Sequence, residues 1–306
     1  MKEKELKTKG RQFAKQTWTI RIYQVVSEKN IASKIMPYLP YQSMTLGELK
    51  TEQRLVAMSM SQGATSENTK VLVIDLDLSK WNMSFRESLV FKIAQDIDNL
   101  LGWGSVLGFS HEFFLHCHFL YNVQCHAPIY DETGYPLEGE NCHISQPGGC
   151  EGLHQKLWTI ITASLIQYTA EFLNEDICIL GQGDNQLVML LLSTRGFEHM
   201  TDQIVNQRML TFIQQLESVF ESAGLKLKVL ETYCSSKLLT YGKNPYLNGC
   251  AIENSLKRVI RVSPDLNTMI PSLYNKLATI STGGEATAKQ SHLPFSAYFV
   301  TTFQSI

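Results

Sequence analysis

The pattern of hydrophobic and polar positions changes most sharply between residues 179 and 190. Two apolar runs there flank the polar tetrad Gly183-Asp184-Asn185-Gln186. This arrangement predicts a β-hairpin with both arms buried. Gly183 and Asn185 tolerate the unusual dihedral angles of a tight turn, and Asp184-Asn185 would form its tip. The carboxylate of Asp184 is costly among so much apolar sequence unless a cation meets it.

The rest of the pattern predicts strands and helices in one compact α/β arrangement. We expect a buried strand at 71–74, helices at 84–101, 152–173 and 201–220, a strand at 225–231, and irregular structure at 102–145. Asp75 and Asp77 would project from one face at the end of the first strand, because strand side chains alternate. Thr201 would cap the third helix, and Gly224 would end it.

The composition predicts a core but no general affinity for nucleic acid. Of the 306 residues, 44% are hydrophobic, and the formal net charge is -2, so no global basic field favours nucleic-acid binding. No apolar run approaches the length of a membrane span. Seven Cys without regular spacing fit a reducing compartment better than a disulfide framework. We therefore expect a soluble, intracellular chain that forms one continuous body.

Two aspartates carry the candidate chemistry. Asp77 and Asp184 each lie at or near the end of an apolar strand. If those strands are neighbours, the two carboxylates can hold two divalent cations such as Mg²⁺, which stabilise the attacking and leaving oxygens in phosphoryl transfer. The simpler alternative is that each is a turn aspartate. The glycine-rich segment between them favours the metal site.

That segment, Ser-Gln-Pro-Gly-Gly-Cys-Glu-Gly at 145–152, runs into the second predicted helix. Glycine lets the backbone approach a ligand closely, and a helix N-terminus favours anions. A local basic stretch adds a second candidate contact, with Lys2, Lys4, Lys7, Lys9, Arg11, Lys15 and Arg21. It is either a solvated helix face or a contact to a triphosphate or template backbone.

A rival metal site is suggested by the His and Cys residues that precede the glycine-rich segment. They are His111, His116, Cys117, His118, Cys125, His126, Cys142 and His143. Such density is suited to Zn²⁺, but the usual Cys-x-x-Cys spacing is absent. We favour scattered core and loop residues over a structural zinc. No oriented Cys/His pair predicts a nucleophile.

Taken in order, these segments resemble the polymerase region of the large (L) protein of non-segmented negative-strand RNA viruses, the Mononegavirales. Residues 183–186 match that group's version of polymerase motif C, and Leu-Asp-Leu-Ser-Lys-Trp-Asn at 76–82 looks like motif A. Residues 148–159 resemble motif B, 224–232 motif D, and 236–243, with Gly249 beyond, motif E. Residues 2–14, continued at Arg21 and Glu28, are similar to a fingers motif. The Trp81 motif and the Cys/His usage suggest a bornavirus-like branch.

The resemblance implies a role for each matched residue. Asp77 and Asp184 would bind Mg²⁺ or Mn²⁺, and Lys228 would protonate the pyrophosphate leaving group. Asn82 takes the place from which other polymerases sense the ribose. The residues implied to contact the triphosphate, position template and nucleotide, or shape the turn around the metals are Arg11, Arg21, Gly148, Gly149, Glu151, Gln155, Gly183, Asn185 and Gln186.

The implied fold class is α/β (α+β): the palm of a right-hand RNA polymerase with partial fingers, built on a central antiparallel sheet backed by helices. Residues 1–70 would form partial fingers, 71–260 the palm with motifs A to E and a fingers-type insert at 102–145, and 261–306 the start of a thumb or connector. Because the family's protein is several times longer, we expect a fragment, an engineered piece or an endogenised viral reading frame.

The implied activity is that of an RNA-directed RNA polymerase, with nucleotidyl transfer from nucleoside triphosphates for viral transcription and replication. Its partners would be RNA template and product, a viral phosphoprotein cofactor and nucleoprotein-coated RNA, without a membrane. The implied location is the virion and host cytoplasm, or the host nucleus for a bornavirus-like branch. The alternative is a non-catalytic polymerase remnant that binds RNA or a viral cofactor and interferes with the full-length enzyme.

Overall fold

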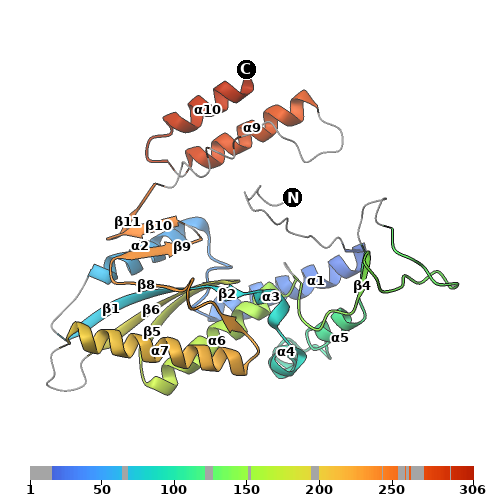
Figure 1. Cartoon of the computed structure of the whole chain (residues 1–306), viewed down its shortest axis with the longest axis horizontal. Helices are drawn as coiled ribbons and strands as arrows, with labels where there is room; N and C mark the ends of the chain where they lie inside the picture. The colour runs from blue at the N-terminus through green and yellow to red at the C-terminus, as the bar shows by residue number, and fades with distance from the viewer. Residues whose placement is uncertain are drawn as a thin grey trace.

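The computed structural model describes residues 16–63, 68–120, 127–150, 153–193, 200–242, 244–253, 259, 262, 272–289 and 291–306. At its centre lies a four-stranded antiparallel sheet in the order β5-β6-β1-β8 (Figure 1). The strands are β1 (Thr69–Leu76), β5 (Asp176–Gln182), β6 (Asn185–Ser193) and β8 (Tyr233–Ser235). β5 and β6 form the predicted hairpin, and β1 contains the predicted strand at 71–74. The chain is a mixed α and β fold on an antiparallel sheet, as predicted.

Two long helices, α6 (Gln155–Leu173) and α7 (Asp202–Ser222), cover one face of the sheet (Figure 1). The core on this face includes Leu72, Ile74, Leu76, Leu157, Trp158, Val188, Leu190, Leu192, Phe212, Leu216 and Phe220. The predicted ends of α7 are confirmed: Thr201 Oγ1 accepts a hydrogen bond from the N–H of Ile204, and Gly224, with φ +77°, follows the last turn.

The opposite face is covered by α2 (Glu48–Gly63) and by a small sheet of β9 (Leu238–Tyr241), β10 (Asn244–Leu247) and β11 (Cys250–Ala251). A second core lies there, with Leu55, Met58, Val71, Val73, Leu180, Leu187, Met189, Leu239, Tyr241 and Tyr246. Because β1 and β6 bury alternate residues on both faces, their sequences are continuous apolar runs rather than alternating ones.

The N-terminal helix, α1 (Trp18–Asn30), continues through η1 (Ile31–Ile35) and η2 (Met36–Tyr38) toward the edge of the sheet. At that edge the N–H of Gly181 donates to the carbonyl of Tyr41, and the N–H of Ser43 donates to the carbonyl of Gly181, both at 3.0 Å. A short bridge therefore covers β5 beside the hairpin turn.

The helix expected at 84–101 is present as α4 (Glu87–Leu101), which begins three residues later than predicted. It is preceded by a short helix, α3 (Trp81–Ser84), and between the two Phe85 is extended and stacks on Trp158 at 4.7 Å between ring centroids. The expected irregular region at 102–145 contains α5 (Ser110–Leu115) and a hairpin of β3 (His118–Leu120) and β4 (Cys142–Ile144).

Two further boundaries were predicted wrongly. The strand expected at 225–231 is only β7 (Lys226–Leu227), which pairs with β2 (Leu78–Ser79). One more hydrogen bond follows this pairing, from the N–H of Lys228 to the carbonyl of Asp77, and the chain then turns, with the N–H of Glu231 donating to the carbonyl of Lys228 at 2.9 Å. The helix expected from 152 begins instead at Gln155, after His154 in the left-handed region at φ +51°.

The last described segment is a pair of helices, α9 (Leu273–Ala288) and α10 (Phe295–Ser305), which pack against each other (Figure 1). Many of their large apolar side chains are exposed, including Tyr274 and Phe295. Within the described part of the chain, no helix combines the length and the apolar character needed to cross a membrane.

A buried carboxylate on α4 provides a test of the fold. Asp98 is fully buried and accepts hydrogen bonds from the N–H groups of Leu107 and Gly108, each at 2.9 Å. Asp98→Ala would leave both donors unpaired, so we expect the free energy of unfolding to fall by about 3 kcal/mol in urea denaturation. Asp96→Ala, which removes an exposed carboxylate from the same helix, should cost less than about 0.5 kcal/mol. Equal losses in the two variants would contradict this role.

Candidate active site

The two predicted metal ligands lie at the same end of the sheet, on neighbouring strands. β1 and β6 pair as far as Leu76 opposite Gln186, so Asp77 follows directly beside the hairpin turn. Asp184 is exposed in that turn, and Asp77 is part-exposed. The condition set by the sequence for a two-carboxylate site, that the strands be neighbours, is therefore met.

The hairpin turn is one residue earlier than predicted. Gln182 pairs with Asn185, so the tip is Gly183-Asp184 and not Asp184-Asn185. Gly183 has φ +64°, while neither Asp184 nor Asn185 has a positive φ. Glycine at the first central position is typical of a type II′ hairpin. Asn185 instead begins β6, with its Nδ2 3.4 Å from Asp184 Oδ1.

Lys228 is fixed beside Asp77 by its backbone and its side chain. Its N–H donates to the carbonyl of Asp77 at 2.9 Å, continuing the pairing of β2 with β7. Its Nζ donates to Asp77 Oδ2 at 3.1 Å and to Glu231 Oε2 at 2.9 Å. One ammonium group thus serves two carboxylates at the site.

This arrangement sets the charges of the pair. Burial raises the pKa of Asp77 above its ordinary value, the hydrogen-bonded Glu231 raises it further, and Lys228 lowers it. The pKa of Lys228 is raised by its hydrogen bonds to Glu231 and Asp77. Lys228 is therefore a protonated donor at neutral pH, and its charge favours the ionised form of Asp77.

Close packing requires glycine at both positions of the Gly148-Gly149 pair. A Cβ on Gly148 would come 2.1 Å from the carbonyl oxygen of Met83, and one on Gly149 would come 2.8 Å from that of Asn82. Neither glycine has a positive φ, so space and not dihedral freedom dictates the residue type. The loop before α6 is thus packed directly on the α3 backbone, which follows Asp77 by four residues.

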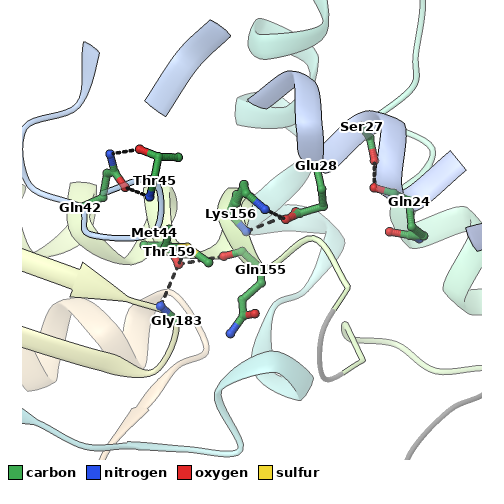
Figure 2. A network of polar contacts seen from close by, with 10 residues as sticks. All are labelled: Gln24, Ser27, Glu28, Gln42, Met44, Thr45, Gln155, Lys156, Thr159 and Gly183. Atoms are coloured by element: carbon green, nitrogen blue, oxygen red, sulfur yellow. Dashed lines mark hydrogen bonds and ion pairs between the residues drawn. The ribbon is translucent and has the colours of Figure 1, made fainter. Parts of the chain in front are cut away.

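The start of α6 contacts both the hairpin turn and α1. Thr159 Oγ1 accepts a hydrogen bond from the N–H of Gly183 at 3.0 Å and donates to the carbonyl of Gln155 at 2.8 Å (Figure 2). Lys156 Nζ donates to Glu28 Oε2 on α1 at 2.7 Å (Figure 2). Gln155 and Gly183 are brought together, because a Cβ on Gly183 would lie 2.8 Å from Gln155 Nε2.

Gln186 is a fully buried residue whose side chain lies within its own hairpin. Its Nε2 donates to the carbonyl of Gly183 at 2.7 Å. It pairs across the hairpin with Gly181, where an added Cβ would come 2.3 Å from Gln186 Oε1. The sequence predicted that Gln186 shapes the turn, but not the roles of Gly181 and Thr159, whose partners are five and 24 residues away. The Gly-x-Gly spacing at 181–183 was the available signal for the former.

Other predicted residues are not joined to the two acids. Asn82 lies against Gly149 through its backbone, and its Oδ1 is buried without a hydrogen-bond partner in the part of the chain described. Arg21 is exposed on α1, and among the described residues no hydrogen bond or ion pair links it to Asp77 or Asp184. Arg11 and Glu151 lie outside the described residues.

Asp75 lies close enough to Asp77 for that carboxylate to raise its pKa, but its own hydrogen bond goes to another element. Its Oδ2 accepts a hydrogen bond from Thr240 Oγ1 on β9 at 2.6 Å, and burial raises its pKa above the ordinary value. Asp75 therefore links β1 to the small sheet.

The His and Cys residues of 111–143 do not form a cluster that would hold a metal ion among the residues described. His111 is buried with Nε2 3.0 Å from the carbonyl oxygen of Phe85, and burial lowers its pKa. Its ring packs against Phe114 and Trp158 as part of the aromatic core. Cys125 and His126 lie outside the described residues.

Comparison with known proteins finds relatives that match nearly the whole chain. The family model described as Mononegavirales RNA dependent RNA polymerase matches residues 1–306. The chain is 32% identical over 300 residues to the large structural protein of Rabies virus (strain silver-haired bat-associated), covering 95% of the chain and 14% of that protein. It has the same identity to the large structural protein of Mokola virus, over the same shares of the two proteins.

A plant virus protein gives a similar match. The chain is 30% identical over 312 residues to the RNA-directed RNA polymerase L of Lettuce necrotic yellows virus, covering 96% of the chain and 15% of that protein. The chain thus spans about one seventh of the length of these relatives. The bornavirus-like branch stays a prediction. The chain belongs to the RNA-dependent RNA polymerase family of the Mononegavirales.

Proposed function

We propose that this chain is the palm, with part of the fingers, of an RNA-directed RNA polymerase that transfers nucleotides from nucleoside triphosphates to the 3′ end of an RNA. The observation that carries the proposal is the pairing of β1 with β6, which places Asp77 beside the turn that exposes Asp184. Two carboxylates at neighbouring strand ends are the protein component of a two-metal nucleotidyl-transfer site.

The donor set fits Mg²⁺ or Mn²⁺. Both side chains are accessible, and both present hard oxygen ligands. Mg²⁺ is commonly bound by one or two carboxylates, with water and substrate phosphates as the other ligands, so two aspartates suffice. When bound, the ions would lower the pKa of the attacking hydroxyl and neutralise charge on the phosphates.

Lys228 is the proposed proton donor. It is cationic, part-exposed and within hydrogen-bond distance of Asp77, so a triphosphate held at that carboxylate would lie near its ammonium group. Transfer of a proton from Nζ to the departing pyrophosphate oxygen would offset the negative charge that develops there. Without substrate, the ammonium group donates separate hydrogen bonds to Asp77 and to Glu231.

The remaining matched residues would bind the substrates. Gly148 and Gly149 hold the loop close to α3, where Asn82 Oδ1 has no hydrogen-bond partner among the described residues and is the group we propose to face the nucleotide ribose. Gln155 lies against the hairpin turn, and Arg21 is an exposed cation suited to a phosphate. RNA template, nucleoside triphosphates and the viral phosphoprotein are proposed partners of the longer protein to which such a region belongs.

Metal binding and catalysis can be tested separately on the purified chain. We expect Asp184→Ala to weaken Mn²⁺ binding, followed by electron paramagnetic resonance, and to lower primer extension with Mg²⁺ or Mn²⁺ by roughly 100-fold or more. Asp176→Ala, at the other end of β5, should change neither measurement. Well-folded chain that retains RNA or cofactor binding without any extension would overturn autonomous catalysis and favour the interfering remnant. Mn²⁺ binding that is insensitive to Asp184→Ala would overturn the metal site.

The Asp77–Lys228 pair predicts a shift in a carboxyl titration. Lys228→Met removes the cation that lowers the pKa of Asp77, so the midpoint of the Asp77 carboxyl titration should move to higher pH in carbon NMR spectra. Any activity that needs ionised Asp77 would then be lost at a higher pH as the solution is acidified. Lys228→Arg keeps the charge, so it should leave the midpoint near that of the original chain while lowering extension by roughly 100-fold.

The exposed Lys226, on β7, provides the matched control. Lys226→Met should shift neither the titration nor the rate. A midpoint that does not move in Lys228→Met would show that the ion pair contributes nothing to the charge state of Asp77.

A further inference from the structure

We infer that Thr159 and Gln186 are positioning residues for Asp184, because together they hold both backbone polar groups of Gly183. The inference rests on the proposed function, since it names the side chains that fix the geometry of that site. Neither side chain contacts the reacting atoms in this role. Both act through the peptide backbone that precedes the carboxylate.

The two hydrogen bonds fix the peptide planes on both sides of one Cα atom. The N–H of Gly183 belongs to the plane before it and donates to Thr159 Oγ1 at 3.0 Å. The carbonyl of Gly183 belongs to the plane after it and accepts from Gln186 Nε2 at 2.7 Å. Thr159 and Gln186 are fully buried, whereas Asp184, the next residue along, is exposed. The exposed carboxylate thus extends from a backbone that is held from inside the protein.

The hydroxyl of Thr159 is oriented for this purpose by its own helix. It donates its single hydrogen to the carbonyl of Gln155 at 2.8 Å, which leaves a lone pair for the N–H of Gly183 (Figure 2). The sulfur of Met44 lies 3.2 Å away but is the weaker acceptor. A bond to the carbonyl four residues earlier is common for buried helical threonines. The contact to another element distinguishes Thr159.

The side-chain amide of Gln186 occupies the space left by the missing side chain of Gly181 on the opposite strand. Gln186 pairs with Gly181, where any Cβ would approach Oε1 to 2.3 Å, so the amide can lie across the hairpin only above a glycine. Its Oε1 has no hydrogen-bond partner in the described part of the chain. Burial of this oxygen without a partner destabilises the fold, and the hydrogen bond from Nε2 to the carbonyl of Gly183 offsets part of that cost.

The same turn of α6 also contacts α1, which belongs to the segment proposed as partial fingers. Lys156, three residues before Thr159, donates from both its N–H and its Nζ to Glu28 on α1 (Figure 2). A displacement of the start of α6 would therefore act on α1 and on the Gly183 peptide together. Because motif B is proposed to contact template and nucleotide, this provides a physical connection between substrate binding and the position of Asp184.

The test uses Thr159→Val in the purified chain, since valine keeps the shape of threonine and lacks the hydroxyl. We expect roughly 10-fold weaker Mn²⁺ binding, as is usual when a group that orients a metal ligand is removed. We also expect faster hydrogen exchange of the Gly183 amide. Thr159→Ser, which restores the hydroxyl, should return both values to within about 2-fold of the original chain.

Thr169→Val is the matched control. Thr169 is buried on the same helix, and among the described contacts its hydroxyl bonds only to the carbonyl of Leu165. Thr169→Val therefore measures the effect of removing a buried hydroxyl that bonds only within the helix. Equal effects of Thr159→Val and Thr169→Val on Mn²⁺ binding and on Gly183 exchange would overturn the inference, as would failure of Thr159→Ser to restore them. If Asp184→Ala leaves Mn²⁺ binding unchanged, the proposed function fails, while exchange of the Gly183 amide still decides the role of Thr159.

Discussion

The candidate site depends on one register, the antiparallel pairing of β1 with β6 that sets Leu76 opposite Gln186. A slip of one residue would move Asp77 by about 3.3 Å along the strand and turn every β1 side chain to the other face. The usual pattern of apolar and polar faces cannot specify this register, because both faces of the sheet are buried. The register is supported instead by contacts at the turn end, where β2 pairs with β7 and α6 bonds to Gly183.

The electrostatic balance of the site follows from the same placement. A carboxylate at the end of an apolar strand is partly desolvated, which raises its pKa and favours its neutral form. The strand pairing places Lys228 beside Asp77, and its charge acts against that effect. Glu231 limits this gain, since it competes for the same ammonium group. The charge state of Asp77 thus depends on the balance among burial, Lys228 and Glu231.

Local patterns predicted most of the sheet and its two long helices. The apolar runs around 71–74 and 179–190, the Thr201 cap and the Gly224 stop depend on neighbours in sequence, and each is present in the structure. The errors arose where contacts with residues far away in the sequence determine the local structure. Phe85, between α3 and α4, stacks on Trp158, and the strand after Leu225 pairs with β2 over only two residues. The sequence could not distinguish Thr159 from Thr169. Both are threonines of one helix that bond to the carbonyl four residues earlier, and only the fold brings Gly183 to Thr159.

The bridge between residues 41–43 and Gly181 also limits how this sheet can meet other molecules. β5 is an edge strand, and an uncovered edge is a template for the addition of a strand from another chain. Next to the hairpin turn, the N–H and carbonyl of Gly181 are already bonded to Tyr41 and Ser43. An incoming strand would therefore have to pair nearer to Asp176, at the end of β5 opposite Asp184. The bridge thus closes the part of β5 next to Asp184 to the addition of another strand.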